Sequence, residues 1–164
     1  MKISLVTVSF NSAKTLADTI ESVLRQDYDD YEYLVIDGGS TDGTVDILKK
    51  YEPQFSGKMH WISEPDQGMY DGINKGIRMA TGDVVGIINS DDFYHRQDIF
   101  QIVNDSFINH PGIQAIYGDV RFVHPDDLET TVRYYSSARF KPSRFRWGWM
   151  PAHPSLFTLK ENLD

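Results

Sequence analysis

Residues 3–26, ISLVTVSFNSAKTLADTIESVLRQ, contain the pattern that decides the fold. Residues 3–10 are a nearly continuous apolar and β-branched run, which is typical of a strand buried on both faces of a parallel sheet. Ser12 stands where a helix N-cap is expected, before a helix predicted over residues 13–26. The apolar positions of that helix fall on one face and are Leu16, Ile20, Val23 and Leu24. A buried strand followed by an amphipathic helix predicts an α/β unit.

The same alternation continues as far as residue 110. Strands are predicted at residues 33–36, 59–62 and 83–88, and helices at 45–51, 68–80 and 97–109. Thr41 and Asp42 are alternative caps for the second of these helices. This order predicts an open, mostly parallel sheet with helices on both faces. Residues 115–123 and 131–135 have no helix between them, which predicts an antiparallel extension, and no linker divides the chain into two domains.

The composition is that of a single globular domain. With 164 residues, 40% of them hydrophobic, the chain is long enough to bury a core. It contains no cysteine, which excludes disulfides and thiolate metal sites and favours a cytoplasmic location. Neither a signal-peptide core nor a run of about 20 apolar residues occurs, so we expect a soluble chain that is at most peripheral to the inner face of a membrane.

The net charge of −8 argues against nucleic-acid binding, which depends on basic residues that displace counterions from phosphates. The charge is unevenly distributed along the chain. Residues 130–160 contain no acidic residue, and their basic residues are Arg133, Arg139, Lys141, Arg144, Arg146 and Lys160. This basic stretch is either an interaction surface or a solvated loop.

Aspartates follow two of the predicted strands. Asp37 ends the strand at 33–36, and Asp91 and Asp92 follow the strand at 83–88. Because the carboxyl ends of parallel strands meet at one edge of a sheet, we expect these three carboxylates to converge. Crowded carboxylates repel one another unless a cation lies between them, and Mg²⁺ or Mn²⁺ prefers such oxygen ligands. In the alternative reading, Asp91 and Asp92 are only turn formers or helix caps.

Other nucleotide-binding patterns do not fit. The first strand is followed by SFNSAK rather than by a glycine-rich turn, which argues against a dinucleotide-dependent oxidoreductase. The sequence also lacks the GxxxxGK[ST] phosphate loop of nucleotide triphosphatases. A phosphatase with Asp37 as its nucleophile would need a second acid two positions later, where Gly39 stands.

Four motifs in register carry a resemblance to a known family: SLVTVSFN at 4–11, VIDGGSTDGT at 35–44, SEPDQGMYDGINKGI at 63–77 and ATGDVVGIINSDD at 80–92. Together they closely resemble the family 2 glycosyltransferases, inverting enzymes with the α/β GT-A fold. Residues 66–77 are most similar to the bacterial surface-polysaccharide members. The resemblance implies that residues 1–95 are the nucleotide-binding half and residues 96–164 part of the acceptor-side half of a single domain, 1–164.

The reaction implied by this resemblance is transfer of a sugar, with inversion, from a UDP-, GDP- or dTDP-linked donor to a glycan or lipid-linked acceptor in polysaccharide biosynthesis. The residues that would line the base pocket are Thr7, Val8, Ser9 and Asn11, with Asp37 bonding the base ring. Those on the nucleotide and sugar side of the cleft would be Asp66, Gly68, Asp71 and Asn74. Read singly, Asp66, Asp71 and Asn74 fit equally well as cap or loop residues.

The metal site implied by the resemblance lies in the DXD region. Asp91 is expected near the ribose or phosphates and as a ligand, and Asp92 as the principal ligand of Mn²⁺ or Mg²⁺. Asn89 stands where many relatives have an aspartate, so the terminal pair carries the role. His153 lies in a segment similar to the histidine-containing acceptor region of the family and is a further candidate ligand, with a structural role as the alternative.

The general base is the one part of the predicted site for which the four motifs provide no residue. In the family it lies in an acidic motif beyond the segment similar to PAHPSLFTLKENLD at 151–164, so the chain looks truncated. Asp119 is a substitute base, with a strand-end turn as the other interpretation. The alternative function is therefore a non-catalytic nucleotide-sugar-binding or assembly domain that lacks the base. The basic, aromatic stretch at 139–150 fits either a lipid-diphosphate acceptor or an anionic membrane surface, in the second case as a peripheral contact.

Overall fold

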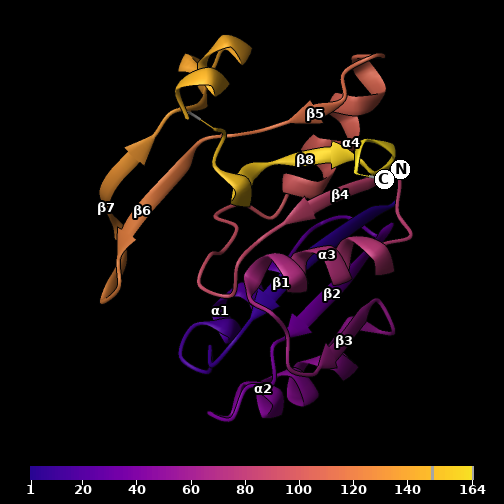
Figure 1. Ribbon diagram of the computed structural model, residues 1–164, viewed down its shortest axis with the longest axis vertical. Helices are drawn as coiled ribbons and strands as arrows, with labels where there is room; N and C mark the ends of the chain where they lie inside the picture. The colour runs from indigo at the N-terminus through magenta and orange to yellow at the C-terminus, as the bar shows by residue number, and fades with distance from the viewer. Residues whose placement is uncertain (149, 164) are drawn as a thin grey trace.

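The computed structural model describes residues 1–148 and 150–163 and contains a six-stranded sheet with a separate hairpin (Figure 1). The order across the sheet is β3-β2-β1-β4-β8-β5. β1 to β4 run parallel, and β8 runs antiparallel to β4 and β5. The bounds are β1 Ile3–Ser9, β2 Tyr31–Asp37, β3 Met59–Ser63, β4 Val84–Ile87, β5 Ala115–Ile116 and β8 Phe157–Leu159. The predicted α/β fold with a mostly parallel sheet is confirmed.

Helices cover both faces of this sheet, as predicted. Their bounds are α1 Leu16–Leu24, α2 Thr44–Tyr51, α3 Met69–Met79 and α4 Ile99–Asn109. Alternate residues of β1 separate two apolar layers. Ile3 and Leu5 face α1, α2 and α4, whereas Val6 and Val8 face α3. The apolar runs of the central strands are therefore buried from both sides, which is why they are continuous rather than alternating.

Two glycines determine where α3 begins and how closely it packs on the sheet. Gly68 precedes the helix with a φ of 107°, a conformation that other residues rarely adopt. A Cβ atom on Gly76 would lie 2.3 Å from Val6 Cγ1, so any larger residue would push α3 away from β1. Glycine in a helix costs about 1 kcal/mol relative to alanine. This cost is offset here because only glycine lets α3 pack directly against β1.

Some predicted helix boundaries are wrong. α1 begins at Leu16 rather than at residue 13, and Ser12 does not cap it, because its hydroxyl lies 2.8 Å from the Ser90 hydroxyl. α4 begins at Ile99 rather than at residue 97. At α2 the N-cap is Gly43 rather than Thr41 or Asp42, although Asp42 Oδ1 accepts a hydrogen bond from the Thr44 backbone N–H at 3.1 Å.

The C-terminal third differs most from the sequence-based expectation. The predicted strand at 115–123 is interrupted, since β5 ends at Ile116 and the next strand begins at Val120. β6 Val120–His124 and β7 Asp127–Tyr135 form an antiparallel hairpin that stands away from the main sheet (Figure 1). Short 3₁₀ helices complete the chain at η1 Glu52–Phe55, η2 Ser137–Arg139, η3 Pro142–Trp147, η4 His153–Ser155 and η5 Lys160–Asn162. The antiparallel strand of the main sheet is β8, which is too short to give a periodic signal.

Within the described ranges, none of the helices has the length and apolar character of a bilayer-spanning segment.

Candidate functional site

Polar loops gather at the carboxyl edge of the parallel strands. β1, β2 and β3 end in register, with Ser9 opposite Asp37 and Asp37 opposite Ser63. The loop after β4 lies beside the loop after β1. The two loops are joined by a hydrogen bond between the Ser12 and Ser90 hydroxyls, which are 2.8 Å apart. The edge at which ligands of open α/β sheets bind is therefore the edge on which the predicted site residues fall.

The turn Asn89–Asp92 is held in place by α1. Its own hydrogen bond joins the Asp92 N–H to the Asn89 carbonyl at 3.2 Å. The fully buried Thr19 hydroxyl donates to the Asp92 carbonyl at 2.7 Å, and the Ser22 hydroxyl accepts from the Tyr94 N–H at 3.1 Å. These partners explain why α1 buries two hydroxyls beside an apolar layer. The backbone around Asp92 is consequently fixed on both sides.

Asn89 connects Asp92 to His153. Its Nδ2 donates to Asp92 Oδ2 at 3.2 Å and lies 2.8 Å from His153 Nε2. Because an amide nitrogen only donates, the histidine Nε2 accepts here and its proton resides on Nδ1. Asn89 Oδ1 is buried and has no hydrogen-bond partner within the described part of the chain. In the sequence, Asn89 was notable only because it stands where many relatives have an aspartate. Its position between Asp92 and His153 could not be predicted from the sequence.

The two adjacent aspartates have different environments. Asp91 is exposed, whereas Asp92 is half-buried. Burial and then the neighbouring charge of Asp91 raise the pKa of Asp92 above its ordinary value, against the smaller lowering effects of His153 and Asn89. A carboxyl group in this setting is stabilised in its ionised form by any cation that reaches it.

Asp37 does not join this pair, so the expected convergence of three carboxylates is wrong. β1 lies between β2 and β4 in the sheet. The Asp37 carboxylate is fully buried and accepts hydrogen bonds from Ser9, Gly39, Ser40 and Ser63. Burial raises the pKa of Asp37, but these donors, Ser40 and Ser63 above all, outweigh burial and lower it. Among the described residues, no group of three or more histidine or acidic side chains is placed to hold a metal ion.

At the end of β1, the side chains of the predicted base-pocket residues are mostly used in packing and loop contacts. The Thr7 side chain is fully buried, accepts a hydrogen bond from the Tyr33 hydroxyl at 3.1 Å and so faces the core rather than a pocket. Val8 faces α3 on the opposite side of the sheet. Asn11, with a positive φ of 50°, accepts from the Thr41 N–H at 3.0 Å and so fixes the loop after β2. Of the predicted base-pocket residues, Ser9 and Asn11 lie at the strand end itself.

The start of α3 brings Asp66 to the end of β2. Asp66 Oδ1 accepts from the Gly68 N–H at 2.8 Å, and its Oδ2 would lie 2.9 Å from a Cβ atom on Gly38. Asp71 accepts from the Gln67 N–H at 3.2 Å and pairs with Lys75 at 3.4 Å. The predicted Asn74 is exposed. Asp66 thus reaches the strand edge, while Asp71 stabilises the first turn of the helix.

Asp119 is held by the base of the hairpin. It accepts hydrogen bonds from the Tyr134 hydroxyl and from the backbone and side chain of Ser137, the latter two at 2.7 Å. These donors lower the pKa of Asp119, with Tyr134 contributing most. A carboxylate that is stabilised in its ionised form is a weak proton acceptor. The strand-end interpretation therefore describes its contacts better than the role of a base.

A hollow lies beside Asp92 rather than over it. A cavity of about 410 Å³ opens between α1, the residues that follow Asp92 and the start of β7. Its lining is Asp18, Glu21, Ser22, Arg25, Phe93, Tyr94, His95, Arg96, Gln97, Leu128 and Glu129. None of the residues predicted from the sequence belongs to this lining.

Curated relatives of this chain are glycosyltransferases. The PGL/p-HBAD biosynthesis glycosyltransferase of Mycobacterium bovis is 32% identical over 117 residues, which is 71% of this chain and 46% of the relative. An uncharacterized glycosyltransferase of Mycobacterium tuberculosis is 42% identical over 117 residues, 71% of this chain and 44% of the relative. The chain thus spans less than half the length of these relatives.

Solved structures and a family model agree with these relatives. S. aureus TarS 1-349 in complex with UDP-GlcNAc matches with a TM-score of 0.61 and 26% identity, over 67% of this chain and 32% of that one. The mannosyltransferase PcManGT from Pyrobaculum calidifontis, in complex with GDP-Man and Mn²⁺, matches in fold with a TM-score of 0.66 and 22% identity, over 78% and 37%. The family described as glycosyl transferase family 2 matches residues 4–155. This chain therefore belongs to glycosyl transferase family 2 and has its α/β GT-A fold.

Proposed function

We propose that the chain binds a nucleotide-diphosphate sugar at the carboxyl edge of β1, β2 and β4 and transfers the sugar with inversion to an acceptor hydroxyl in glycan synthesis. The observation that carries the proposal is the clamped turn Asn89–Asp92, which presents a half-buried carboxylate beside His153. The complexes of S. aureus TarS with UDP-GlcNAc and with UDP support a nucleotide-sugar ligand.

A divalent cation fits the donors at this turn. Asp92 provides a carboxylate, and Asn89 Oδ1 is a buried acceptor without a partner among the described residues. His153 would provide an imidazole nitrogen, Nε2, once the Asn89 amide releases it. Mg²⁺ and Mn²⁺ are commonly bound by one or two carboxylates, with substrate phosphates supplying further oxygens. We propose Asp92 as the principal ligand, with Asp91 and His153 beside it. When bound, the cation neutralises charge on the departing diphosphate.

The remaining groups define the proposed donor pocket. Ser9, Asn11 and Asp37 lie on the β1 and β2 side, where we place the base. The five hydrogen bonds to Asp37 fix its carboxylate before any ligand arrives. Asp66 and the α3 start lie at the end of β2, where we place the ribose and sugar.

The test of this proposal is calorimetry combined with a turnover assay. UDP and GDP are titrated into the chain with Mn²⁺ and with a chelator, and UDP-GlcNAc and GDP-mannose are then tested for release of the nucleoside diphosphate. We expect one nucleotide to bind only when Mn²⁺ is present, and its sugar conjugate to be turned over. Binding without turnover would favour the alternative of a non-catalytic nucleotide-sugar-binding domain. If neither nucleotide binds under either condition, the proposal is wrong.

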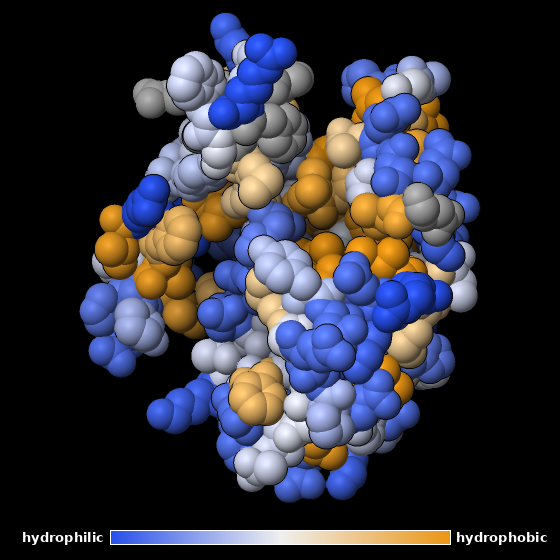
Figure 2. Space-filling view, viewed as in Figure 1, coloured by the Kyte–Doolittle hydropathy of each residue, from blue (hydrophilic) through white to orange (hydrophobic). Residues whose placement is uncertain are grey.

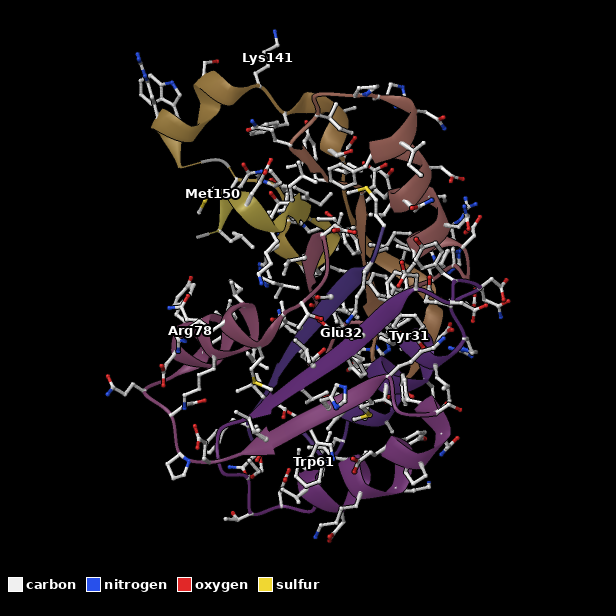
Figure 3. All side chains as sticks on the ribbon, turned by 90° about the vertical axis from the view of Figure 1, so that its right-hand side faces the viewer. Tyr31, Glu32, Trp61, Arg78, Lys141 and Met150 are labelled. Carbon is white, nitrogen blue, oxygen red and sulfur yellow. The ribbon has the colours of Figure 1, made fainter. Side chains whose placement is uncertain are left out.

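A peripheral contact with an anionic membrane is a second part of the proposal. The hairpin, η3 and the segment after it expose apolar side chains: Val132 of β7 is 66% exposed, Trp147 of η3 is 87% exposed and Met150 is 63% exposed. Figure 2 shows hydrophobic side chains on the outward surface of the hairpin, and Figure 3 shows Lys141 projecting outward at the top of its view. Basic residues beside exposed aromatic ones favour an anionic lipid surface. The predicted contributions of Arg139 and Arg144 lie outside the described side chains.

Removal of two charges from this surface should weaken vesicle binding. In the variant Lys141→Gln with Arg146→Gln, we expect affinity for phosphatidylglycerol vesicles to fall about 30-fold, because each basic residue near such a surface contributes about 1 kcal/mol. Flotation of the protein with vesicles measures this change. The matched control is Lys49→Gln with Lys50→Gln on α2, at the opposite end of the molecule (Figure 1). Equal loss in both variants, or no binding by the unmodified chain, would contradict a localised membrane surface.

A further inference from the structure

Tyr94 follows Asp92 by two residues and has a hydroxyl that is buried without a hydrogen-bond partner among the described residues. Buried hydroxyls are almost always partnered, and leaving one unpartnered costs about 1–3 kcal/mol. Asn89, three residues before Asp92, also has a buried side-chain atom, Oδ1, without a hydrogen-bond partner among the described residues. Unsatisfied polar atoms therefore flank the proposed metal ligand, which makes this loop an unusual place in an otherwise well-bonded chain.

The position of the Tyr94 ring is fixed from several elements. It makes an edge-to-face contact with Phe100 of α4 at 5.7 Å between centroids and lies nearly parallel to Phe157 of β8 at 6.4 Å. The Tyr94 N–H is bonded to Ser22 of α1. Because the ring and the backbone of Tyr94 are both fixed, the hydroxyl cannot move toward a hydrogen-bond acceptor. An acceptor group must therefore move toward the hydroxyl.

Asp92 is the group placed to do so. Asp92 lies only two residues before Tyr94, and the backbones of both residues are bonded to α1, through Thr19 and Ser22, so the two side chains belong to one fixed loop. The Asp92 backbone is held by Thr19, whereas its side chain accepts, from the described residues, a single hydrogen bond, at Oδ2 from the Asn89 amide. A carboxylate accepts several hydrogen bonds, so a rotation of the Asp92 side chain can add a second donor.

We infer that Tyr94 is a positioning residue, whose fixed hydroxyl donates a hydrogen bond to the Asp92 carboxylate when a cation and a nucleoside diphosphate are bound. The inference rests on the proposed function, because it takes Asp92 as the metal ligand. Carboxylates that bind metals are usually hydrogen-bonded in turn, and loss of such a partner costs about 10- to 100-fold in metal affinity. The hydroxyl therefore destabilises the ligand-free chain and stabilises the bound one.

The variant Tyr94→Phe tests this inference because it removes the hydroxyl alone. In the ligand-free chain we expect the midpoint of urea unfolding to stay unchanged or to rise. In calorimetric titrations with UDP present, we expect the affinity for Mn²⁺ to fall about 10- to 100-fold. The control is Tyr31→Phe, whose ring packs on the same Phe100 at 5.2 Å but lies at the start of β2, far from the strand ends (Figure 3). It should leave the Mn²⁺ affinity unchanged.

Each other outcome overturns the inference in a recognisable way. Unchanged Mn²⁺ affinity in Tyr94→Phe would show that the hydroxyl plays no part in the bound state. A clear loss of stability in the ligand-free variant would show that the hydroxyl already has a partner there, such as an ordered water. If the unmodified chain itself fails to bind UDP with Mn²⁺, the proposed function fails and the role of Tyr94 with it, whereas normal binding by the unmodified chain confines any failure to Tyr94.

Discussion

Replacement of Asp92 by asparagine is expected to abolish Mn²⁺-dependent nucleotide binding while leaving the fold intact. The loss should exceed about 100-fold, because removal of a ligand costs more than the 10- to 100-fold typical of the residues that support it. Stability should not fall, since burial and the adjacent Asp91 already disfavour the ionised carboxyl, and the variant removes that charge. The Thr19 hydroxyl bonds the backbone carbonyl at this position and is unaffected.

Calorimetry with UDP and Mn²⁺, paired with urea unfolding, measures both expectations. Asp126→Asn is the matched control, because it removes an equally charged side chain from an exposed position at the turn of the hairpin. Asp91→Asn should have a smaller effect than Asp92→Asn, since the Asp91 carboxylate is exposed and no hydrogen bond to it is seen in the described part of the chain. If Asp92→Asn binds UDP with Mn²⁺ as tightly as the unmodified chain, Asp92 is not the ligand.

The part of the fold that the sequence predicts is the part with strong local signals. The buried strands β1, β2 and β4 are recognisable as short, continuous apolar and β-branched runs, and the amphipathic helices between them are recognisable from their periodicity. β8 is not, because a three-residue strand has no period and its pairing with β4 and β5 joins segments far apart in the chain. The hairpin is partly visible in the sequence, but its separation from the main sheet depends on the interruption at residues 117–119.

The candidate site is predicted in outline and differs in detail for related reasons. Strand order decides which loops meet, and the sequence does not reveal that β1 separates Asp37 from Asp92. Nor does it reveal that Asn89 bridges Asp92 and His153, which are 61 residues apart, because that contact depends on tertiary structure. Nor does the sequence reveal that the Thr19 and Ser22 hydroxyls of α1 bond the backbone of Asp92 and Tyr94.

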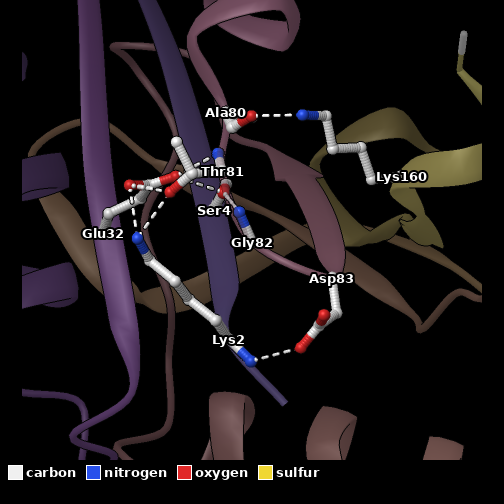
Figure 4. A network of polar contacts seen from close by, with 8 residues as sticks. All are labelled: Lys2, Ser4, Glu32, Ala80, Thr81, Gly82, Asp83 and Lys160. Atoms are coloured by element: carbon white, nitrogen blue, oxygen red, sulfur yellow. Dashed lines mark hydrogen bonds and ion pairs between the residues drawn. The ribbon is translucent and has the colours of Figure 1, made fainter.

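A buried polar network at the opposite edge of the sheet determines much of the expected stability (Figure 4). Glu32 of β2 is 6% exposed and pairs with Lys2 at 2.8 Å. It also accepts hydrogen bonds from the Ser4 hydroxyl and from the backbone and side chain of Thr81. Burial raises the pKa of Glu32, but these partners outweigh burial and lower it to about 2. The network joins β1, β2 and the turn before β4 at the end where the strands begin.

Replacement of Glu32 by glutamine should lower the free energy of unfolding by about 3–5 kcal/mol at neutral pH, because it leaves Lys2 unpaired and turns an acceptor into a donor facing other donors. The pKa of Glu32 is lowered on folding, so its contribution is fully present above the ordinary value of 4.5 and is lost as the pH falls towards 2. The difference in unfolding free energy between the unmodified chain and the variant should therefore shrink across that interval in urea titrations.

The matched control is Glu64→Gln, which breaks an ion pair between Glu64 and Lys75. The Glu64 side chain is 56% exposed, so this variant should lower the free energy of unfolding by less than about 1 kcal/mol at any pH. A pH-independent difference for Glu32→Gln, or one no larger than for Glu64→Gln, would show that the network does not stabilise the fold through the Glu32 charge.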